Sequence, residues 1–219
     1  MKPVKALILG LLLLVPILIF IFISVFGTHH FTLKTYYPKL DDAGKVVYDV
    51  AGDTVFEQVP YFKLQSLKGD SLAQSDLDEH IYVAGFFGLP CGAACGKMFS
   101  QLVRVQEVFA NNPELKLVSI GVGEGQDKAQ TLQELAEEYG VEHRKWLLLT
   151  GDKATVQSLA EDFHEPFALK EDTVEPSQRL VLVDKEKKIR GVYEGTDPED
   201  VDRLILEINV LLDEYSKRK

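Results

Sequence analysis

The sequence predicts an α/β fold in which helices cover both faces of a largely parallel central sheet. Short, nearly all-apolar runs such as Ile81–Phe87 and Leu115–Val122 are typical of strands that are buried on both faces. Segments with helical periodicity separate these runs, and such alternation requires a mostly parallel sheet. The last apolar runs, Leu180–Val183 and Ile189–Tyr193, bracket a polar turn and predict an antiparallel hairpin.

Each remaining element follows from a local pattern. Residues 61–67 and the turn Lys68-Gly69-Asp70 predict a strand that leads into a hairpin turn. Residues 146–149 form a third apolar strand. Four helices are predicted from inward apolar faces that begin at Phe99, Ala129, Val156 and Val201. This order of elements predicts a thioredoxin-like fold, a central mixed sheet flanked by helices, over residues 59–219.

The composition is globular with a strong acidic excess. The chain has 219 residues, of which 46% are hydrophobic and 26% charged, and a formal net charge of −10. The first 26 residues contain two lysines and no acidic residue, so residues 27–219 carry 22 basic and 34 acidic side chains, a net charge of −12. Such an acidic body is unsuited to phosphate backbones or anionic lipids. Nucleic acid is therefore excluded as a partner.

The N-terminal region predicts a single transmembrane anchor. From Ala6 to Phe26 all but three residues are strongly apolar, and at about 1.5 Å per residue such a helix spans the hydrocarbon core of a bilayer. Lys2 and Lys5 precede it, so the positive-inside rule keeps residues 1–5 in the cytoplasm. A cleaved signal peptide is the alternative, but it normally has a shorter apolar core and small residues at its cleavage site.

The predicted organisation has four parts: a cytoplasmic N-terminus (1–5), an anchor (6–26), a tether (27–58) and a thioredoxin-like domain (59–219). No arginine precedes Arg104, which disfavours a mitochondrial targeting peptide. We therefore expect a single-pass protein of the bacterial inner membrane whose C-terminal domain lies on the periplasmic side.

Cys91 and Cys95, the two cysteines, carry the strongest functional signal. They follow the strand at residues 81–87 and lie at the opening of the next helix. Side chains four residues apart on a helical turn face the same way, at a Cα separation near the disulfide range. A helix N-terminus favours thiolate, the form that attacks disulfides and binds metals. A structural disulfide is the alternative, but closing so short a loop removes little chain entropy.

The residues around this pair resemble the Sco/SenC family, membrane-anchored thioredoxin-fold factors of cytochrome c oxidase assembly. Family members carry Cys-x-x-x-Cys after a strand similar to Tyr82–Phe87. Other stretches similar to family sequence are Lys145–Lys153, Leu182–Asp184 and Ile189–Tyr193. The resemblance covers roughly residues 58–195. It implies copper binding through both cysteines and one distant histidine, and a respiratory oxidase subunit with a copper site as client.

The sequence departs from the family pattern at the third copper ligand. The family histidine lies eight residues before the aspartate of the Leu-Val-Asp motif, and this position is Pro176 here. Gly92 and Gly96 replace the prolines that often follow the cysteines, and Gly123 stands where the family often has aspartate. Two thiolates suit Cu(I), but loss of the imidazole weakens Cu(II) binding most. His164 is the nearest histidine in the chain and the candidate for a substitute ligand.

Three functional hypotheses follow. The first is a membrane-tethered thiol–disulfide protein in which Cys91 attacks, Cys95 resolves the mixed disulfide, and a thiol reductant is a further partner. The second is a copper metallochaperone that binds Cu(I) through the two cysteines and a third ligand. The third is a redox-inert docking module in a membrane complex.

Three further features are expected to have a structural rather than a chemical role. Met98, one turn beyond Cys95, is expected to pack in the core rather than offer a thioether to copper. The glycine-rich residues 121–125 lack the spacing of a dinucleotide-binding motif and predict a loop. The acidic tract 161–175 is expected to be a solvated loop near the missing ligand, or else a docking face for a basic partner.

Overall fold

The computed structural model describes residues 12, 14–22, 32–123, 128–165, 168–170 and 173–217. The chain divides into two compact units, Met1–Thr32 and Leu33–Lys219. In the first unit, residues 14–22 are helical. Among the described residues, no helix is both long enough and apolar enough to cross a membrane. The predicted anchor, residues 6–26, lies in large part outside the described residues.

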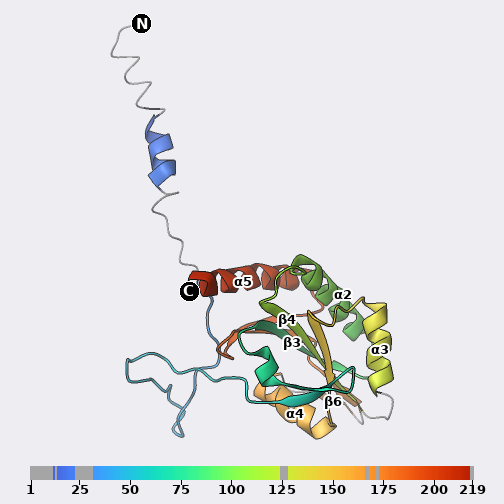
Figure 1. The fold of residues 1–219 in the computed structure, drawn as a ribbon. Helices are drawn as coiled ribbons and strands as arrows, with labels where there is room; N and C mark the ends of the chain where they lie inside the picture. Colours follow the sequence, from blue (N-terminus) through green and yellow to red (C-terminus); the bar gives the residue numbers. More distant parts are fainter. Residues whose placement is uncertain are drawn as a thin grey trace, which may run out of the picture. The chain divides into compact units, whose positions relative to one another are not determined.

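The second unit is built on a seven-stranded mixed sheet (Figure 1) with the strand order β2-β1-β5-β4-β3-β8-β9. Strands β3, β4 and β5 are parallel neighbours at its centre, and the outer pairs are antiparallel. In chain order the strands are β1 (Lys63–Ser66), β2 (Ser71–Ala73), β3 (Ile81–Gly88), β4 (Leu115–Val122), β5 (Trp146–Thr150), β8 (Arg179–Val183) and β9 (Ile189–Glu194). The predicted mixed sheet with a terminal hairpin is confirmed.

Helices cover both faces of this sheet. One face carries α2 (Ala93–Val108), α3 (Lys128–Glu138) and α5 (Pro198–Lys217), and the other carries α4 (Lys153–Asp162) and the 3₁₀ helix η1 (Gln74–Leu77). Strand β3 serves both cores, because successive side chains of a strand point to opposite faces. Val83 and Phe87 lie in the core beneath α2, whereas Tyr82 and Phe86 lie in the core beneath α4.

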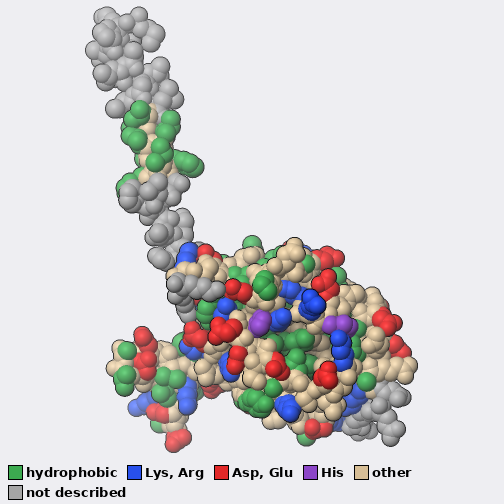
Figure 2. Space-filling model, viewed as in Figure 1, with side chains coloured by type: hydrophobic (Ala, Val, Ile, Leu, Met, Phe, Trp, Pro, Cys, Tyr) green, Lys and Arg blue, Asp and Glu red, His purple; other side chains and the backbone are tan. Residues whose placement is uncertain are grey.

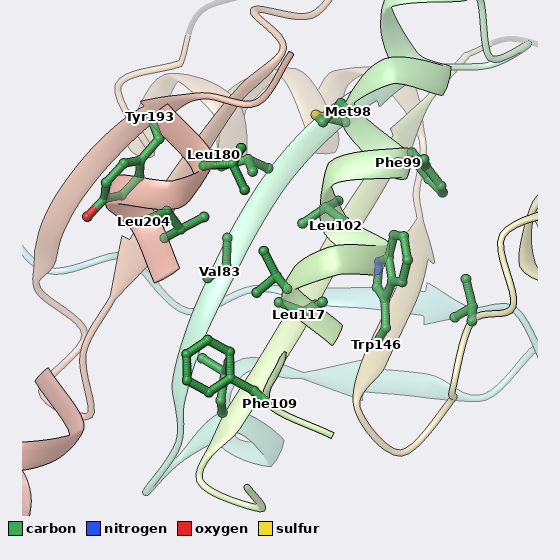
Figure 3. Close-up of a cluster of buried hydrophobic side chains, with 14 of the residues drawn as sticks. Val83, Met98, Phe99, Leu102, Phe109, Leu117, Trp146, Leu180, Tyr193 and Leu204 are labelled. Carbon is green, nitrogen blue, oxygen red and sulfur yellow. The ribbon is translucent and has the colours of Figure 1, made fainter. Parts of the chain in front are cut away.

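The core beneath α2 is built from large side chains that three helices and the sheet contribute (Figure 3). Phe99 and Leu102 of α2 and Trp146 of β5 are at most 1% exposed. The indole N–H of Trp146 donates to the hydroxyl of Ser119 at 2.9 Å, which satisfies its buried polar group. This packing fixes α2 against the sheet and therefore fixes the loop that carries the cysteines.

Part of the segment predicted as a tether, residues 27–58, is bonded to the sheet between Leu33 and Tyr36. The N–H of Tyr36 donates to the carbonyl of Ile189 at 2.9 Å, beside the edge strand β9. Directly after the segment, the N–H of Val59 donates to the carbonyl of Lys187 at 2.8 Å. These bonds satisfy backbone groups that an isolated tether would leave to water.

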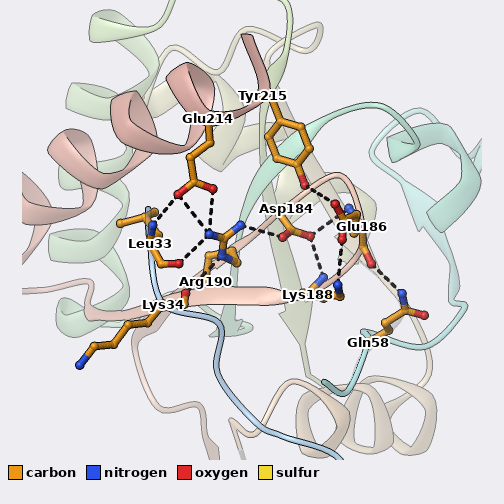
Figure 4. A network of polar contacts seen from close by, with 9 residues as sticks. All are labelled: Leu33, Lys34, Gln58, Asp184, Glu186, Lys188, Arg190, Glu214 and Tyr215. Carbon is orange, nitrogen blue, oxygen red and sulfur yellow. Dashed lines mark hydrogen bonds and ion pairs between the residues drawn. The ribbon is translucent and has the colours of Figure 1, made fainter. Parts of the chain in front are cut away.

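A buried ionic network holds the start of this segment (Figure 4). Arg190 is 5% exposed, and its guanidinium forms ion pairs with Asp184 at 3.1 Å and with Glu214 at 2.9 Å. The same guanidinium donates to the carbonyl oxygens of Leu33 and Lys34. The network therefore joins Leu33 and Lys34 to β9, to the turn between β8 and β9, and to α5.

The acidic tract at residues 161–175 differs from the predicted solvated loop. It contains a two-stranded antiparallel hairpin, β6 (Ala168–Lys170) with β7 (Thr173–Glu175). Glu165, which precedes this hairpin, is fully buried. The prediction was wrong for this residue because charge alone does not show which carboxylate has a buried partner.

Candidate functional site

Cys91 and Cys95 form a disulfide at the point where β3 leads into α2, with their Cα atoms 5.4 Å apart. After β3 the chain passes through a cis peptide between Leu89 and Pro90. It then reaches Gly92, whose extended backbone makes it the N-cap of α2. Cys91 precedes this cap and Cys95 is the third residue of the helix, so only Cys95 lies on the first helical turn.

The two sulfur atoms differ in their access to solvent. Cys95 is 3% exposed and belongs to the core beneath α2, whereas Cys91 is half-buried at the surface. Gly92 provides no capping side chain, so the first N–H groups of α2 have no side-chain acceptor from the cap. These groups and the helix dipole favour negative charge near the cysteines. Cys91 is therefore the sulfur that an incoming thiol or disulfide can reach.

Leu89 fixes this loop against the neighbouring strand β4. Its N–H donates to the carbonyl of Val122 at 2.7 Å. A Cβ atom on Gly123 would lie 2.5 Å from the carbonyl oxygen of Leu89, and one on Gly121 would lie 2.9 Å from its Cδ1. This close approach requires glycine at residue 123, where a Cβ would meet the backbone of Leu89, whereas at residue 121 the side chain of Leu89 would have to shift. No side chain, aspartate included, fits at residue 123 while the loop keeps this path.

Tyr139 closes the other side of the first turns of α2. Its hydroxyl lies 3.0 Å from the position of a Cβ on Gly96, and its ring packs edge-on against Phe99 at 5.2 Å. Burial raises the pKa of Tyr139, so the phenol is neutral at ordinary pH. Met98 is fully buried in the same cluster as Leu180 (Figure 3), in agreement with its expected place in the core.

Pro176, at the position of the absent histidine, lies near the same end of the sheet. The pairing of β3 with β8 extends to Gly85 opposite Leu180. Pro176 lies three residues before β8 begins at Arg179, and the backbone of Gln178 between them has a φ angle of 61°. Pro176 is itself buried, and its carbonyl accepts a bond from the side-chain amide of Gln178 at 3.2 Å. A buried proline, and not an imidazole, therefore stands at the position of the family histidine.

Glu165 is a buried carboxylate next to this segment, and sequence reasoning missed it. One of its oxygens accepts a bond from the Ser177 hydroxyl at 2.6 Å and pairs with the Arg179 guanidinium at 2.9 Å. The other oxygen, Oε1, has no hydrogen-bond partner in the described part of the chain. Burial raises the pKa of Glu165 against the opposing effects of Ser177 and Arg179.

His164, the candidate substitute ligand, is engaged by other partners. Its ring stacks on Tyr37 with 3.6 Å between the ring centroids, and its Nε2 lies 2.9 Å from a carboxylate oxygen of Glu57. Among the described residues, no group of three or more His, Cys, Asp and Glu side chains is placed to hold a metal ion. The pair Cys91 and Cys95 would offer two soft thiolates to Cu(I) once its disulfide is reduced.

Other features of the site had a weak signal in the sequence. The glycine-rich residues 121–125 were predicted as a loop, but Gly121 and Val122 belong to β4, and residues 124 and 125 lie outside the described residues. Tyr139 gave no signal beyond an apolar helical position, because its contact with Gly96 depends on how α3 and α2 pack. The ion pair between Glu165 and Arg179 could not be predicted, because the two residues come together only when the whole sheet has formed.

Comparison with known proteins gives consistent results. A family model described as SCO1/SenC matches residues 52–212. The SCO1 protein homolog of Bacillus subtilis strain 168 is 23% identical over 161 residues, which cover 71% of this chain and 83% of that protein.

Solved structures share the fold. A SCO1/SenC family lipoprotein from Bacillus anthracis strain Ames superposes with a TM-score of 0.65 at 21% identity, covering 71% of this chain and 95% of that one. BsSco, described as having a disulfide switch and as a member of the Sco family of cytochrome c oxidase assembly proteins, gives 0.62 at 21% identity, covering 71% and 93%. ScoI of Arabidopsis thaliana with copper bound gives 0.59 at 22%, covering 71% and 98%. These likenesses confirm the thioredoxin-like α/β fold.

Proposed function

The chain belongs to the SCO1/SenC family, and from this premise we propose that it is a membrane-tethered thiol–disulfide protein of respiratory oxidase assembly. The observation that carries the proposal is the disulfide between Cys91 and Cys95, with one sulfur at the surface and the other in the core. A pair at a helix N-terminus, with one accessible sulfur, suits exchange better than stapling, because the loop that it closes is short.

In the proposed reaction the reduced pair transfers two electrons to a client disulfide. The Cys91 thiolate attacks one client sulfur; a Cys91–client disulfide forms, the client S–S bond breaks, and the released client thiolate takes a proton from water. The Cys95 thiol loses its proton to water, and its thiolate then attacks the sulfur of Cys91. This step releases the second client thiolate, which is protonated in turn, and forms the Cys91–Cys95 disulfide. The client gains two thiols, and a thiol reductant restores the protein.

The proposed client is the cysteine pair of a copper site in a respiratory oxidase subunit. The family supports this choice, and BsSco is described as a member of a family of cytochrome c oxidase assembly proteins. Thiolates bind copper and disulfides do not, so reduction of such a pair must precede entry of the metal.

We also propose that residues 6–26 anchor the chain in the bacterial inner membrane and that the second unit lies on the periplasmic side. The apolar run and the preceding Lys2 and Lys5 support this orientation. An oxidising compartment is where a disulfide pair requires a dedicated reductant.

A copper carrier is the second candidate function. Structures of Arabidopsis thaliana ScoI and Bradyrhizobium japonicum ScoI have copper bound, and the reduced cysteines are ligands of the right softness for Cu(I). Pro176 in place of histidine leaves the described residues without an imidazole at that position. We therefore place the thiol–disulfide reaction first.

The test is a redox titration of the full-length chain in mild detergent. The protein is equilibrated in dithiothreitol buffers of graded redox ratio, and its free thiols are counted by alkylation and mass measurement. We expect one reversible two-electron transition. A disulfide that stays closed in excess reductant would instead support a structural staple in a redox-inert docking module, and thiols that do not re-form the disulfide would contradict a reversible redox role.

A further inference from the structure

A projecting segment near the start of the second unit has a defined shape although it contributes little to the hydrophobic core. Residues 37–57, here called the excursion, extend away from the sheet (Figure 1). Three antiparallel bridges join its short segments: Pro38↔Phe56, Leu40↔Val46 and Tyr48↔Thr54. Among the described residues, Tyr37 is the excursion side chain that packs against a buried core cluster. An ordered segment that covers so little core has another use for its surface.

The order comes from a turn motif that the chain uses twice. Residues 40–47 and 48–55 share the pattern x-Asp-x-Ala-Gly-x-x-Val. In each turn the aspartate, Asp41 or Asp49, accepts bonds from the N–H groups two and four residues later, at 2.8 to 3.0 Å. The glycines, Gly44 and Gly52, have φ angles of 74° and 88°, which glycine adopts without steric cost. Local chemistry therefore fixes the shape of the excursion.

The base of the excursion is pinned to the domain. Tyr37 stacks on His164, and Glu57 pairs with the same imidazole. The N–H of Glu57 donates to the carbonyl of Tyr37 at 2.9 Å, which closes the base. The side-chain amide of Gln58 donates to the carbonyl of Glu186 at 2.9 Å, in the turn between β8 and β9. The base of the excursion is thus held by His164, just beyond the end of α4, and by the turn between β8 and β9.

A groove of about 750 Å³ lies where the excursion meets the end of α4 and the β8–β9 turn. Its charged lining consists of the lysines Lys39 and Lys188 and the carboxylates Asp49, Glu57, Glu161 and Asp162. Glu57 is neutralised by His164 when the imidazole is charged, and Lys188 pairs with Glu186. Within the described residues, no ion pair engages the other three carboxylates. The groove therefore presents an excess of unpaired negative charge.

Apolar side chains of the excursion stand in solvent: Leu40 lines the groove, and Tyr48 and Val50 flank the lining residue Asp49 in the chain. Leu40 is 53% exposed, Tyr48 is 61% exposed and Val50 at the tip of the second turn is fully exposed. Figure 2 shows apolar, acidic and basic side chains next to one another on the projecting lobe. Exposed apolar groups gathered on one small segment mark an interaction surface.

We propose that the groove and the excursion form a docking surface for an extended, basic segment of a partner protein, in which lysine or arginine alternates with apolar residues. The cations would meet Asp49, Glu161 and Asp162, and the apolar side chains would meet Leu40 and Tyr48. A second copy of this chain does not fit, because residues 27–219 carry a net charge of −12 and would bring like charges together.

This surface is separate from the cysteine site and goes beyond the proposed function. Lys188 belongs to the turn that follows Val183, which pairs with Tyr82 near the start of β3. The cysteines follow the opposite end of β3, eight residues along the strand. A partner bound at the groove therefore leaves the disulfide accessible.

The test measures binding of a labelled peptide, acetyl-Gly-Lys-Leu-Lys-Val-Lys-Gly-amide, to the full-length protein by fluorescence anisotropy. A matched peptide with glutamate in place of each lysine is the probe for charge. The groove variant is Glu161→Gln with Asp162→Asn. The control, Glu107→Gln with Glu138→Gln, removes equal charge from α2 and α3. Tyr48→Ser tests the excursion without touching α4.

We expect the lysine peptide to bind, and its affinity to fall about tenfold in the groove variant, with a smaller loss in Tyr48→Ser and a change below about twofold in the control. Binding should be unchanged in the double variant Cys91→Ser with Cys95→Ser, which separates this proposal from the thiol reaction. No binding of the lysine peptide, equal binding of the glutamate peptide, or equal losses in groove and control variants would overturn it.

Discussion

The carbonyl oxygen of Leu89 fills the space that a side chain at Gly123 would need, 2.5 Å from the position of its Cβ. This contact joins the loop that carries Cys91 to the end of β4. It explains why glycine stands at residue 123, and it makes the position of the disulfide depend on a neighbouring strand.

We expect Gly123→Ala to destabilise the folded chain by about 1–3 kcal/mol, because the added methyl group forces the backbone of Leu89 to move. Chemical denaturation of the full-length protein measures this loss. Gly92→Ser is the matched control, because a Cβ on Gly92 has no atom within 4 Å and serine is a favourable N-cap. An equal loss in both variants would show that the contact with Leu89 is not the cause.

Removing Arg190, the cation of the buried network, should lower the free energy of unfolding by more than Gly123→Ala does. Arg190→Met leaves the buried carboxylates of Asp184 and Glu214 with their backbone N–H donors but without a cation, and we expect a loss of about 3–5 kcal/mol in the free energy of unfolding. Arg104→Met is the control, since Arg104 and Asp202 form an exposed pair worth less than about 1 kcal/mol. Similar losses in the two variants would contradict the assigned burial.

The pKa of Glu165 predicts a pH dependence of stability. A carboxyl whose pKa is raised on folding binds more protons in the folded chain. Its contribution is therefore complete below its ordinary pKa of 4.5 and is lost as the pH rises through the raised value. We expect the stability of the natural protein relative to Glu165→Gln to fall as the pH rises above 4.5 and to level off once the pH has passed the raised pKa. A difference between the two proteins that stays constant with pH would refute the raised pKa.

The position of His164 predicts that it contributes nothing to copper affinity. The reduced chain is titrated with Cu(I) against a competing chelator. His164→Ala should change the Cu(I) affinity less than about twofold, because Tyr37 and Glu57 hold the imidazole, whereas Cys91→Ser should abolish competitive binding. A large loss of affinity in His164→Ala would instead identify it as the third ligand of a copper carrier.

The central strands and helices were predictable because their side chains repeat with the period of one element. Residues 115–122 formed the strand β4 at its predicted bounds, and the turn at Gly69 joined β1 to β2 as expected. The cysteine pair was also recognised at the end of β3. The attacking role was assigned to Cys91 from the sequence, but the sequence did not show that α2 begins two residues after Cys91 or that the core buries Cys95.

Contacts between segments that are distant in the chain could not be predicted from the sequence. The β6–β7 hairpin lies in an acidic tract with little apolar alternation, so its charge suggested a loop. The excursion had a local signal, the repeated Asp-x-Ala-Gly, which shows two identical turns at Asp41 and Asp49. What the repeat does not show is that Tyr37 and Glu57 meet His164, since this contact depends on where α4 ends.

The most direct test of the thiol–disulfide account is a trapping experiment with single-cysteine variants. Each full-length variant, reduced, is mixed with a model peptide that contains a Cys-x-x-x-Cys disulfide, and the products are resolved by mass. Cys95→Ser should accumulate a stable mixed disulfide through Cys91, because the resolving thiol is gone and Cys91 is accessible. Cys91→Ser should form little, since Cys95 is 3% exposed. Equal trapping by both variants, or none by either, would contradict the account.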